Sequence, residues 1–298
     1  MKSLYMIVNP HGGLKKGLTI LESIKPIFKN ACVNLIIKKT EYAGHAYDFA
    51  KSLDFNNVDG LCAIGGDGTL YELINGMLKR EDGNKLPVGL ITGGTGNSFM
   101  HDLDCLDPID AAKRITKFKN RSIDIMKVKN ASSNKIIYSF NIVGWGVATD
   151  INKRAEKMRW LGEIRYNIAA VIEILKGTQR IAEFSYDDKP FYEDDFVFIL
   201  GCNTVHTGKA MKAAPKAKLN DGLLDIVVVK KANRFKLLFL FPQLFSGNHI
   251  KSPLVEYKQI KKFSIKPKLD SDLNIDGELV GRTPVQVSVE KGLVNVLV

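Results

Sequence analysis

Apolar and polar positions along the first part of the chain follow two periods, one typical of buried strands and one typical of amphipathic helices. Residues 61–64 form an uninterrupted apolar run. Leu70, Leu73, Ile74, Met77 and Leu78 then follow at positions i, i+3, i+4, i+7 and i+8. This pattern predicts a buried strand that leads within a few residues into a helix with one apolar face.

The same order of strand and helix repeats over the first 120 or so residues, with glycine-rich turns near residues 12, 65 and 93. Repeated strand–helix units predict a parallel sheet with helices on both faces. Because such sheets bind ligands at the carboxyl ends of their strands, we expect the three glycine turns to line one cleft. The predicted strands are 4–9, 33–38, 61–64 and 87–91, and the predicted helices are 18–28, 45–53, 70–78 and 109–115.

The pattern changes after about residue 123, where short strands and turns replace the alternating units. These strands predict a mostly antiparallel β-sandwich domain, interrupted by one long helix over 161–176. We therefore expect an α/β nucleotide-binding domain over 1–123 and a β-rich domain over 124–298. The predicted strands are 123–129, 136–143, 181–186, 196–200, 224–229, 263–266 and 285–298.

Composition and charge indicate which kinds of binding partner and which cellular location to expect. The 298 residues carry a formal net charge of +11, which favours an anionic partner. The lysines are scattered and no nucleic-acid-binding motif occurs, so we expect no nucleic-acid partner. No apolar stretch reaches the roughly 20 residues that span a bilayer. The four cysteines form no CxxC pair, which favours free thiols in a cytoplasmic protein.

Two glycine runs suggest chemistry at the predicted cleft. GGDGT at 65–69 precedes a helix, and GGTGN at 93–97 follows the next strand. Such loops let backbone N–H groups approach a phosphate, although tight turns alone also use glycine. A carboxylate beside phosphates is repelled unless Mg²⁺ lies between them or a network of donors holds it, so Asp67 suggests a metal–nucleotide site, with a turn-stabilising Asx residue as the alternative. Thr69 is placed to cap the following helix.

Two known phosphate-binding motifs are excluded, whereas the glycine runs resemble a known family. GxxxxGK[ST] is absent, and GxGxxG fails at Tyr71. GGDGT together with NPHGG at 9–13 resembles the catalytic domain of the diacylglycerol kinase and sphingosine kinase superfamily of lipid kinases. NAD kinases share GGDGT, but the following Glu72 and the GTGNS run at 94–98 resemble the lipid kinases.

The second half of the chain resembles the same superfamily in the expected order. Residues 144–166, which end in LGEIRY, resemble a segment of sphingosine kinases. NDGLLD at 220–225 resembles the Mg²⁺ loop of bacterial lipid kinases, and IDGELV at 275–280 resembles their C-terminal DGE motif. The resemblance implies an ATP- and Mg²⁺-dependent kinase that phosphorylates a lipid hydroxyl.

The resemblance also assigns residues. Glu278 is the first candidate for the general base and Asp67 the second, and both are expected at one crevice. Arg159 and Arg165 are expected to reach phosphates, although solvated helix charges are an equal alternative. Asp221, with the carbonyls of Lys218 and Leu223, is expected to hold Mg²⁺, with an Asx turn as the alternative. The expected nucleotide contacts are Asn9, Pro10, His11, Gly12, Gly13, Thr40, Gly65, Gly66, Asp67, Gly68, Thr69, Glu72, Thr95, Gly96, Asn97, Arg159, Arg165 and Asp276.

The lipid acceptor is less well defined. Ser98 stands where many bacterial relatives have aspartate, which favours the sphingosine kinase pattern. Asn152, however, falls where sphingosine kinases place an acidic residue for the substrate amine, so Asp150 or a neutral lipid is needed to explain the site. The helix face of Ile168, Val171, Ile172 and Leu175 and the apolar segment 235–245 would suit a core or a lipid-binding surface.

A basic protein with such an apolar surface is expected to associate peripherally with an anionic membrane. Two other hypotheses remain open: an NAD kinase-like enzyme, and a lipid-binding protein without activity. The sequence leaves open whether the chain acts alone or as a homodimer.

Overall fold

The computed structural model describes residues 1–13, 15–94, 96–131, 133, 135–178, 180–208 and 211–298. The chain divides into two compact units. Unit 1 comprises Met1–Ile125 and Gly292–Val298, and unit 2 comprises Met126–Lys291. The expected boundary at 123/124 lies close to the start of unit 2, but the last seven residues return to unit 1. The division falls inside two paired strands, β5 (Asn120–Asn130) and β14 (Val285–Leu297).

Unit 1 is built on a parallel sheet in the order β4–β3–β1–β2, as the strand–helix repeat predicted. Its central strand β3 is buried along its whole length, which explains why its sequence is apolar without alternation. The strands are β1 (Lys2–Val8), β2 (Val33–Lys39), β3 (Gly60–Gly65) and β4 (Val88–Thr92).

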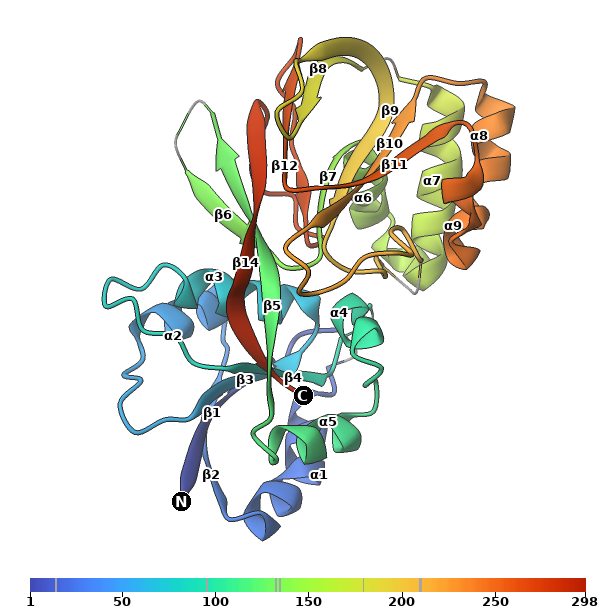
Figure 1. Ribbon diagram of the computed structural model, residues 1–298. Coiled ribbons are helices and arrows are strands. Elements are labelled where there is room, and N and C mark those ends of the chain that lie inside the picture. Colours follow the sequence, from blue (N-terminus) through green and yellow to red (C-terminus); the bar gives the residue numbers. More distant parts are fainter. Residues whose placement is uncertain (14, 95, 132, 134, 179, 209–210) are drawn as a thin grey trace. The chain divides into compact units, whose positions relative to one another are not determined.

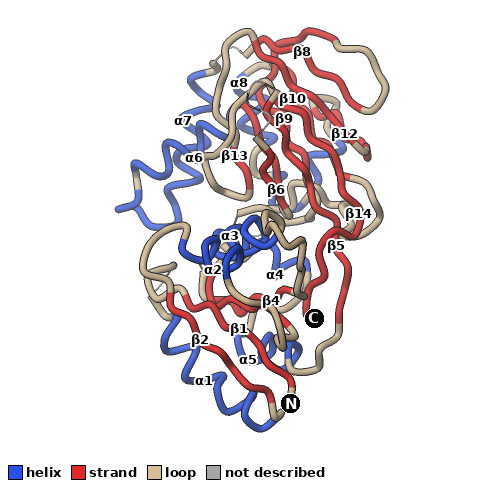
Figure 2. The backbone as a smooth tube through the Cα atoms, turned by 90° about the vertical axis from the view of Figure 1, so that its left-hand side faces the viewer, coloured by secondary structure: helices blue, strands red, loops and turns tan. Residues whose placement is uncertain are grey.

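Helices cover both faces of this sheet: α2 and α3 lie together on one face, α1 and α5 on the other (Figures 1 and 2). In α3 the residues predicted to form the apolar face, Leu70, Leu73, Ile74 and Met77, are all buried. The helices are α1 (Gly17–Asn30), α2 (His45–Ser52), α3 (Asp67–Met77), the short α4 (Ser98–Asp102) and α5 (Pro108–Ile115).

Unit 2 is mostly antiparallel, as expected. The long strand β9 (Tyr192–Cys202) joins its two sheets, because it pairs along one edge first with β8 (Ile181–Tyr186) and then with β7 (Ile142–Gly146). The other strands are β6 (Ile136–Ser139), β10 (Leu224–Lys230), β11 (Val255–Ile260), β12 (Lys262–Pro267) and β13 (Asn274–Ile275).

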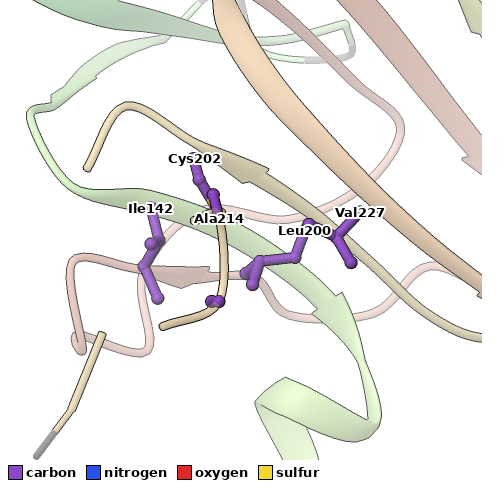
Figure 3. Packing of buried hydrophobic residues seen from close by; sticks show 6 residues of the cluster. Ile142, Leu200, Cys202, Ala214 and Val227 are labelled. Carbon is purple, nitrogen blue, oxygen red and sulfur yellow. The ribbon is translucent and has the colours of Figure 1, made fainter. Parts of the chain in front are cut away.

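Side chains from β7, β9, β10 and the 213–214 segment form a buried cluster in unit 2 (Figure 3). Helices pack nearby, and α7 contacts α6 and α8. No helix in the described residues is both long and apolar enough to cross a bilayer. The helices of unit 2 are α6 (Val147–Lys157), the 3₁₀ segment η1 (Arg159–Ile164), α7 (Arg165–Lys176), α8 (Arg234–Leu240), α9 (Gln243–Ser246) and the 3₁₀ segment η2 (Asn248–Lys251).

Two predictions about unit 2 were wrong in detail. The strand expected over 136–143 is broken into β6 and β7, because the chain turns at Phe140 and Asn141. The helix expected over 161–176 begins as 3₁₀ structure and becomes α-helical only at Arg165, with a kink at Gly162, where φ is +60°.

Candidate functional site

The glycine turns of unit 1 come together at the carboxyl ends of the parallel strands. A Cβ atom added to Gly94 would lie 2.6 Å from Gly66 Cα, and one added to Gly13 would lie 2.7 Å from the Gly93 carbonyl oxygen. The Gly93 N–H donates to the Gly65 carbonyl over 2.7 Å. The loops that follow β1, β3 and β4 are therefore packed backbone to backbone, which only glycine allows.

Asp67 joins two of these loops. It is the first residue of α3, and its carboxylate accepts hydrogen bonds from the backbone N–H groups of Ser98 (2.7 Å) and Phe99 (3.3 Å). These donors belong to the first turn of α4, which lacks intrahelical partners for them. Burial raises the pKa of the Asp67 carboxyl above its ordinary value, and the two N–H donors oppose that rise. A donor network of the expected kind thus holds Asp67.

Asn9 connects the first glycine turn to GGDGT. Its side-chain oxygen accepts from the His11 N–H over 3.0 Å, and its amide nitrogen lies 3.4 Å from the Thr69 hydroxyl. The expectation that Thr69 caps α3 was wrong. Gly66 is the N-cap residue, no side chain caps the helix, and Thr69 is buried inside the first turn. Pro10 and Gly12 lie in the turn after β1, and Gly68 is the second residue of α3.

Asn97 ends the third glycine turn in the left-handed conformation, with φ +49°. Its amide nitrogen donates to the Gly94 carbonyl over 3.0 Å. Its side-chain oxygen is buried and has no hydrogen-bond partner among the described residues, so it retains acceptor capacity for a ligand N–H or O–H group. Gly96 precedes it in the loop, and Thr95 lies outside the described residues.

Glu72 and Thr40 have structural partners next to this edge. The Glu72 carboxylate accepts from the backbone N–H groups of Gly44 (2.9 Å) and Ala46 (3.1 Å), which satisfies the amino end of α2. Thr40 is buried and donates its backbone N–H to the Val8 carbonyl over 2.9 Å. Their predicted nucleotide contacts stay predictions.

In unit 2 the DGE motif forms a tight turn. Ile275 and Glu278 exchange two backbone hydrogen bonds of 2.9 Å, and the intervening Asp276 and Gly277 have φ of +52° and +92°. Positive φ at both central residues is the geometry of a two-residue hairpin turn, which favours the Asp-Gly sequence. The turn leaves Glu278 exposed.

Asp276 itself points into unit 2. Its carboxylate accepts hydrogen bonds from the Ser139 hydroxyl (2.7 Å) and from the backbone N–H groups of Phe140 (3.0 Å), Asn141 (2.9 Å) and Ile142 (2.9 Å). Burial raises the pKa of Asp276 to about 6, against the effect of these donors. Asp276 therefore stabilises the turn between β6 and β7, a contact that local sequence patterns did not predict.

The two residues expected to meet the lipid lie on α6 and are both engaged. Asn152 is buried and donates its side-chain N–H to the Gly277 carbonyl. Asp150 forms an ion pair with Arg180, whose side chain is 11% exposed. Arg180 was not predicted, because nothing in its local sequence marks it as the partner of a residue 30 positions earlier.

The arginines expected to reach phosphates are described to different extents. Arg165 lies 3.6 Å from a Glu156 carboxylate oxygen and over the ring of Tyr166. Its Nε is buried and has no hydrogen-bond partner among the described residues, so it can still donate to an anion. Arg159 lies in η1, but its side chain falls outside the described part of the structure.

The loop expected to hold Mg²⁺ contains an Asx turn, since Asp221 accepts from the Leu223 N–H over 3.0 Å. Asp225 is close enough that the charge of Asp221 adds to burial in raising the pKa of the Asp225 carboxyl. The second oxygen of Asp221 and the carbonyls of Lys218 and Leu223 are hard oxygen donors of the kind Mg²⁺ prefers. No cluster of three or more His, Cys, Asp or Glu side chains occurs in the described ranges.

Comparison with known families decides the identity. Residues 3–128 match the family described as "Diacylglycerol kinase catalytic domain". Residues 141–298, more than half of the chain, match the family described as "YegS C-terminal NAD kinase beta sandwich-like domain". The chain belongs to the diacylglycerol kinase family of lipid kinases. The resemblance found in the motifs is therefore confirmed.

Similar proteins of this family cover almost the whole chain. Sphingosine kinase 1 of Arabidopsis thaliana is 29% identical over 98% of this chain and 74% of its own. A diacylglycerol kinase of Staphylococcus saprophyticus is 32% identical over 87% of both chains. A solved structure from Bacillus anthracis, assigned as a diacylglycerol kinase, matches with a TM-score of 0.81 and 26% identity over 99% of this chain and 97% of its own. The predicted fold class is confirmed.

Proposed function

We propose that this lipid kinase transfers the γ-phosphate of ATP to a hydroxyl group of a membrane lipid. The observation that carries the proposal is the packing of three glycine turns at the carboxyl edge of the parallel sheet, where Gly66 and Gly94 approach too closely for any side chain. Such turns present backbone N–H groups to an anion, and the amino end of α3 adds a favourable dipole. The triphosphate of ATP is the anion that a kinase must hold there.

Glu278 is the general base in this proposal. Phosphoryl transfer needs alignment, charge neutralisation and a group that accepts the hydroxyl proton. Glu278 is exposed and directly follows Asp276 and Gly277, the two central residues of the hairpin turn. Asp67 suits loop positioning better than proton transfer, because both of its carboxylate oxygens accept backbone hydrogen bonds. Glu278 then takes the proton while the lipid oxygen bonds to the γ-phosphorus and the bond from phosphorus to ADP breaks.

We propose Mg²⁺ as the second requirement. Mg²⁺ bound with ATP would neutralise negative charge on the phosphates. Asp221, with the carbonyls of Lys218 and Leu223, would hold a Mg²⁺ ion that stabilises the loop containing these three residues. The negative charge of Asp221, which adds to burial in raising the pKa of Asp225 on β10, supports the assignment. Arg165 would supply the spare donor at Nε to a phosphate oxygen.

The acceptor is a diacylglycerol, a sphingoid base or a lipid of similar structure. The contacts on α6 favour a neutral head group: Asp150 is paired with Arg180, and Asn152 is uncharged and donates to the Gly277 carbonyl. An ammonium group would find no unpaired carboxylate at these two positions. We therefore expect a higher kcat/KM on diacylglycerol than on a sphingoid base.

The test is incubation with radiolabelled ATP, Mg²⁺ and a total lipid extract, followed by identification of the labelled lipid and then by assays on purified lipids. We expect one labelled phospholipid, and loss of labelling in Glu278→Gln. Formation of NADP from NAD and ATP without lipid would replace the proposal with an NAD kinase activity. Lipid binding without any transfer would replace it with a purely lipid-binding role.

A further inference from the structure

Helix α8 in unit 2 is apolar on two sides, and only one of them is covered. Leu237 and Leu240 are buried in a cluster with Ile174 of α7 and Val229 of β10. Phe235 and Phe239, one helical turn apart, are 70% and 77% exposed. A helix that exposes a second apolar side beside its buried one favours an apolar environment beyond the protein core. The core therefore does not explain these two phenylalanines.

The neighbouring helices also expose large apolar side chains. Phe245 of α9 is 42% exposed, and Val171 and Leu175 of α7 are 39% and 44% exposed. Helix α8 packs against both α7 and α9, and the three helices lie together in unit 2 (Figure 1). Large aromatic side chains left exposed over neighbouring elements mark a site of interaction rather than isolated surface residues.

The charge around α8 indicates what kind of partner the exposed phenylalanines contact. Residues 230–251 contain five lysines and arginines and no aspartate or glutamate. Lys230 and Lys231 pair with Asp194 and Asp195. Arg234, Lys236 and Lys251 have no ion-pair partner within the described ranges. Phenylalanines beside unpaired cations complement a bilayer surface, where apolar chains lie beneath anionic head groups.

We propose that α8 is the membrane-docking element of this protein, with Phe235 and Phe239 inserted into the acyl boundary of an anionic bilayer. Lys236 and Lys251 remain at the level of the head groups. The proposal rests on the lipid kinase function for its purpose, because docking would bring the enzyme to its insoluble acceptor. It can fail independently, since membrane binding needs neither ATP nor turnover.

The binding test uses the full chain, without ATP, in sedimentation with phosphatidylcholine vesicles that contain or lack phosphatidylserine. We expect binding to the anionic vesicles, and a loss of affinity of about tenfold or more in the double variant Phe235→Ser with Phe239→Ser. Leu269→Ser is the matched control, because Leu269 is 84% exposed in the loop between β12 and β13. It should bind like the wild type.

A second binding experiment tests the role of charge. It compares the double variant Lys236→Glu with Lys251→Glu, as the test, and Lys29→Glu on α1, as the control. We expect the first to weaken binding to anionic vesicles and to reduce its dependence on salt, and the second to change neither. The proposal would be overturned if the wild-type chain does not bind anionic vesicles, or if the double phenylalanine variant binds them as well as the wild type does. A dimer that the phenylalanine variant breaks, with vesicle binding unchanged, would assign the surface to a second copy of the chain instead.

A kinase assay separates docking from chemistry. The double phenylalanine variant should phosphorylate a short-chain, water-soluble diacylglycerol at the wild-type rate and lose activity only on acceptor in vesicles. Equal loss on both forms of the acceptor would show that α8 acts on catalysis or folding rather than on docking.

Discussion

Each of the two units contains an aspartate within a glycine turn of a family motif. Comparing the two aspartates distinguishes carboxylates that hold a loop in place from the carboxylate that is expected to act on the substrate. In unit 1, Asp67 accepts two backbone hydrogen bonds from the first turn of α4. In unit 2, Asp276 accepts three from the turn between β6 and β7, and a fourth from the Ser139 hydroxyl. Both aspartates thus fix a neighbouring loop. The exposed acid beside Asp276 is Glu278, and it is the one we expect to act on the substrate.

Among the variants that test this comparison, we expect the largest loss of activity for substitution of Glu278. Glu278→Gln should lower kcat by about 10²- to 10⁴-fold, because a general base contributes on that order. The side chain is exposed, so the denaturation midpoint should stay at the wild-type value. Kinetics with the preferred lipid and urea unfolding of the same preparation measure both. An unchanged kcat would remove Glu278 from the mechanism.

The second effect is the pH dependence of stability at Asp276. Its folded-state pKa of about 6 lies above the ordinary value of 3.8. Between these two values the unfolded chain has released a proton that the folded chain keeps, so the free energy of unfolding falls as pH rises. The shift corresponds to about 3 kcal/mol, fully present below pH 4 and lost above pH 6.

Urea unfolding of the wild type and Asp276→Asn from pH 4 to pH 7 measures this contribution. The stability advantage of the wild type over the variant should shrink by most of that amount across the range. Asp188→Asn is the control, since Asp188 is an exposed carboxylate paired with Lys262. An advantage that grows with pH would mean that the four donors outweigh burial and lower the pKa.

Much of the fold was predictable because periodicity is local. Strand β8 matches its predicted bounds, and β3 and α3 follow from an apolar run and a helical stripe. The break between β6 and β7 was not predictable, since it depends on Asp276, more than 130 positions away. The short helix α4 was also missed. Its five residues are too few to show a period, and its first N–H groups depend on Asp67.

The candidate site was predictable as a set of motifs but not as a set of roles. The glycine turns were expected at one edge of the sheet and are found there. The resemblance grouped Asp67, Glu72 and Asp276 with the nucleotide contacts. The structure shows that each of these carboxylates accepts backbone hydrogen bonds from another element. Such partners depend on tertiary contacts, which no local pattern contains.

Asp67→Asn should have a smaller effect than Glu278→Gln, and of a different kind. One side-chain oxygen would remain for Ser98 or Phe99, while the new N–H₂ group would face the other backbone donor. This mismatch should cost about 1–3 kcal/mol of stability. The loss of loop geometry should raise the KM for ATP more than it lowers kcat. Urea unfolding and ATP kinetics, with Asp48→Asn on α2 as control, test this. A loss of kcat as large as in Glu278→Gln, without loss of stability, would make Asp67 the base.

The smallest effect is expected at Asn152, which positions the turn that carries Glu278. Asn152→Asp would replace the N–H donor to the Gly277 carbonyl with a repelling carboxylate. A displaced turn should lower kcat by about tenfold, or about 1.4 kcal/mol, for diacylglycerol and sphingoid base alike. The KM for either lipid should change little. Asn152→Ala, which loses the bond without the repulsion, should lie between wild type and Asn152→Asp. If Asn152 instead contacts the lipid head group, the new negative charge will raise kcat/KM for the cationic sphingoid base alone. The ratio of the two kcat/KM values therefore distinguishes a positioning role from a contact with the substrate.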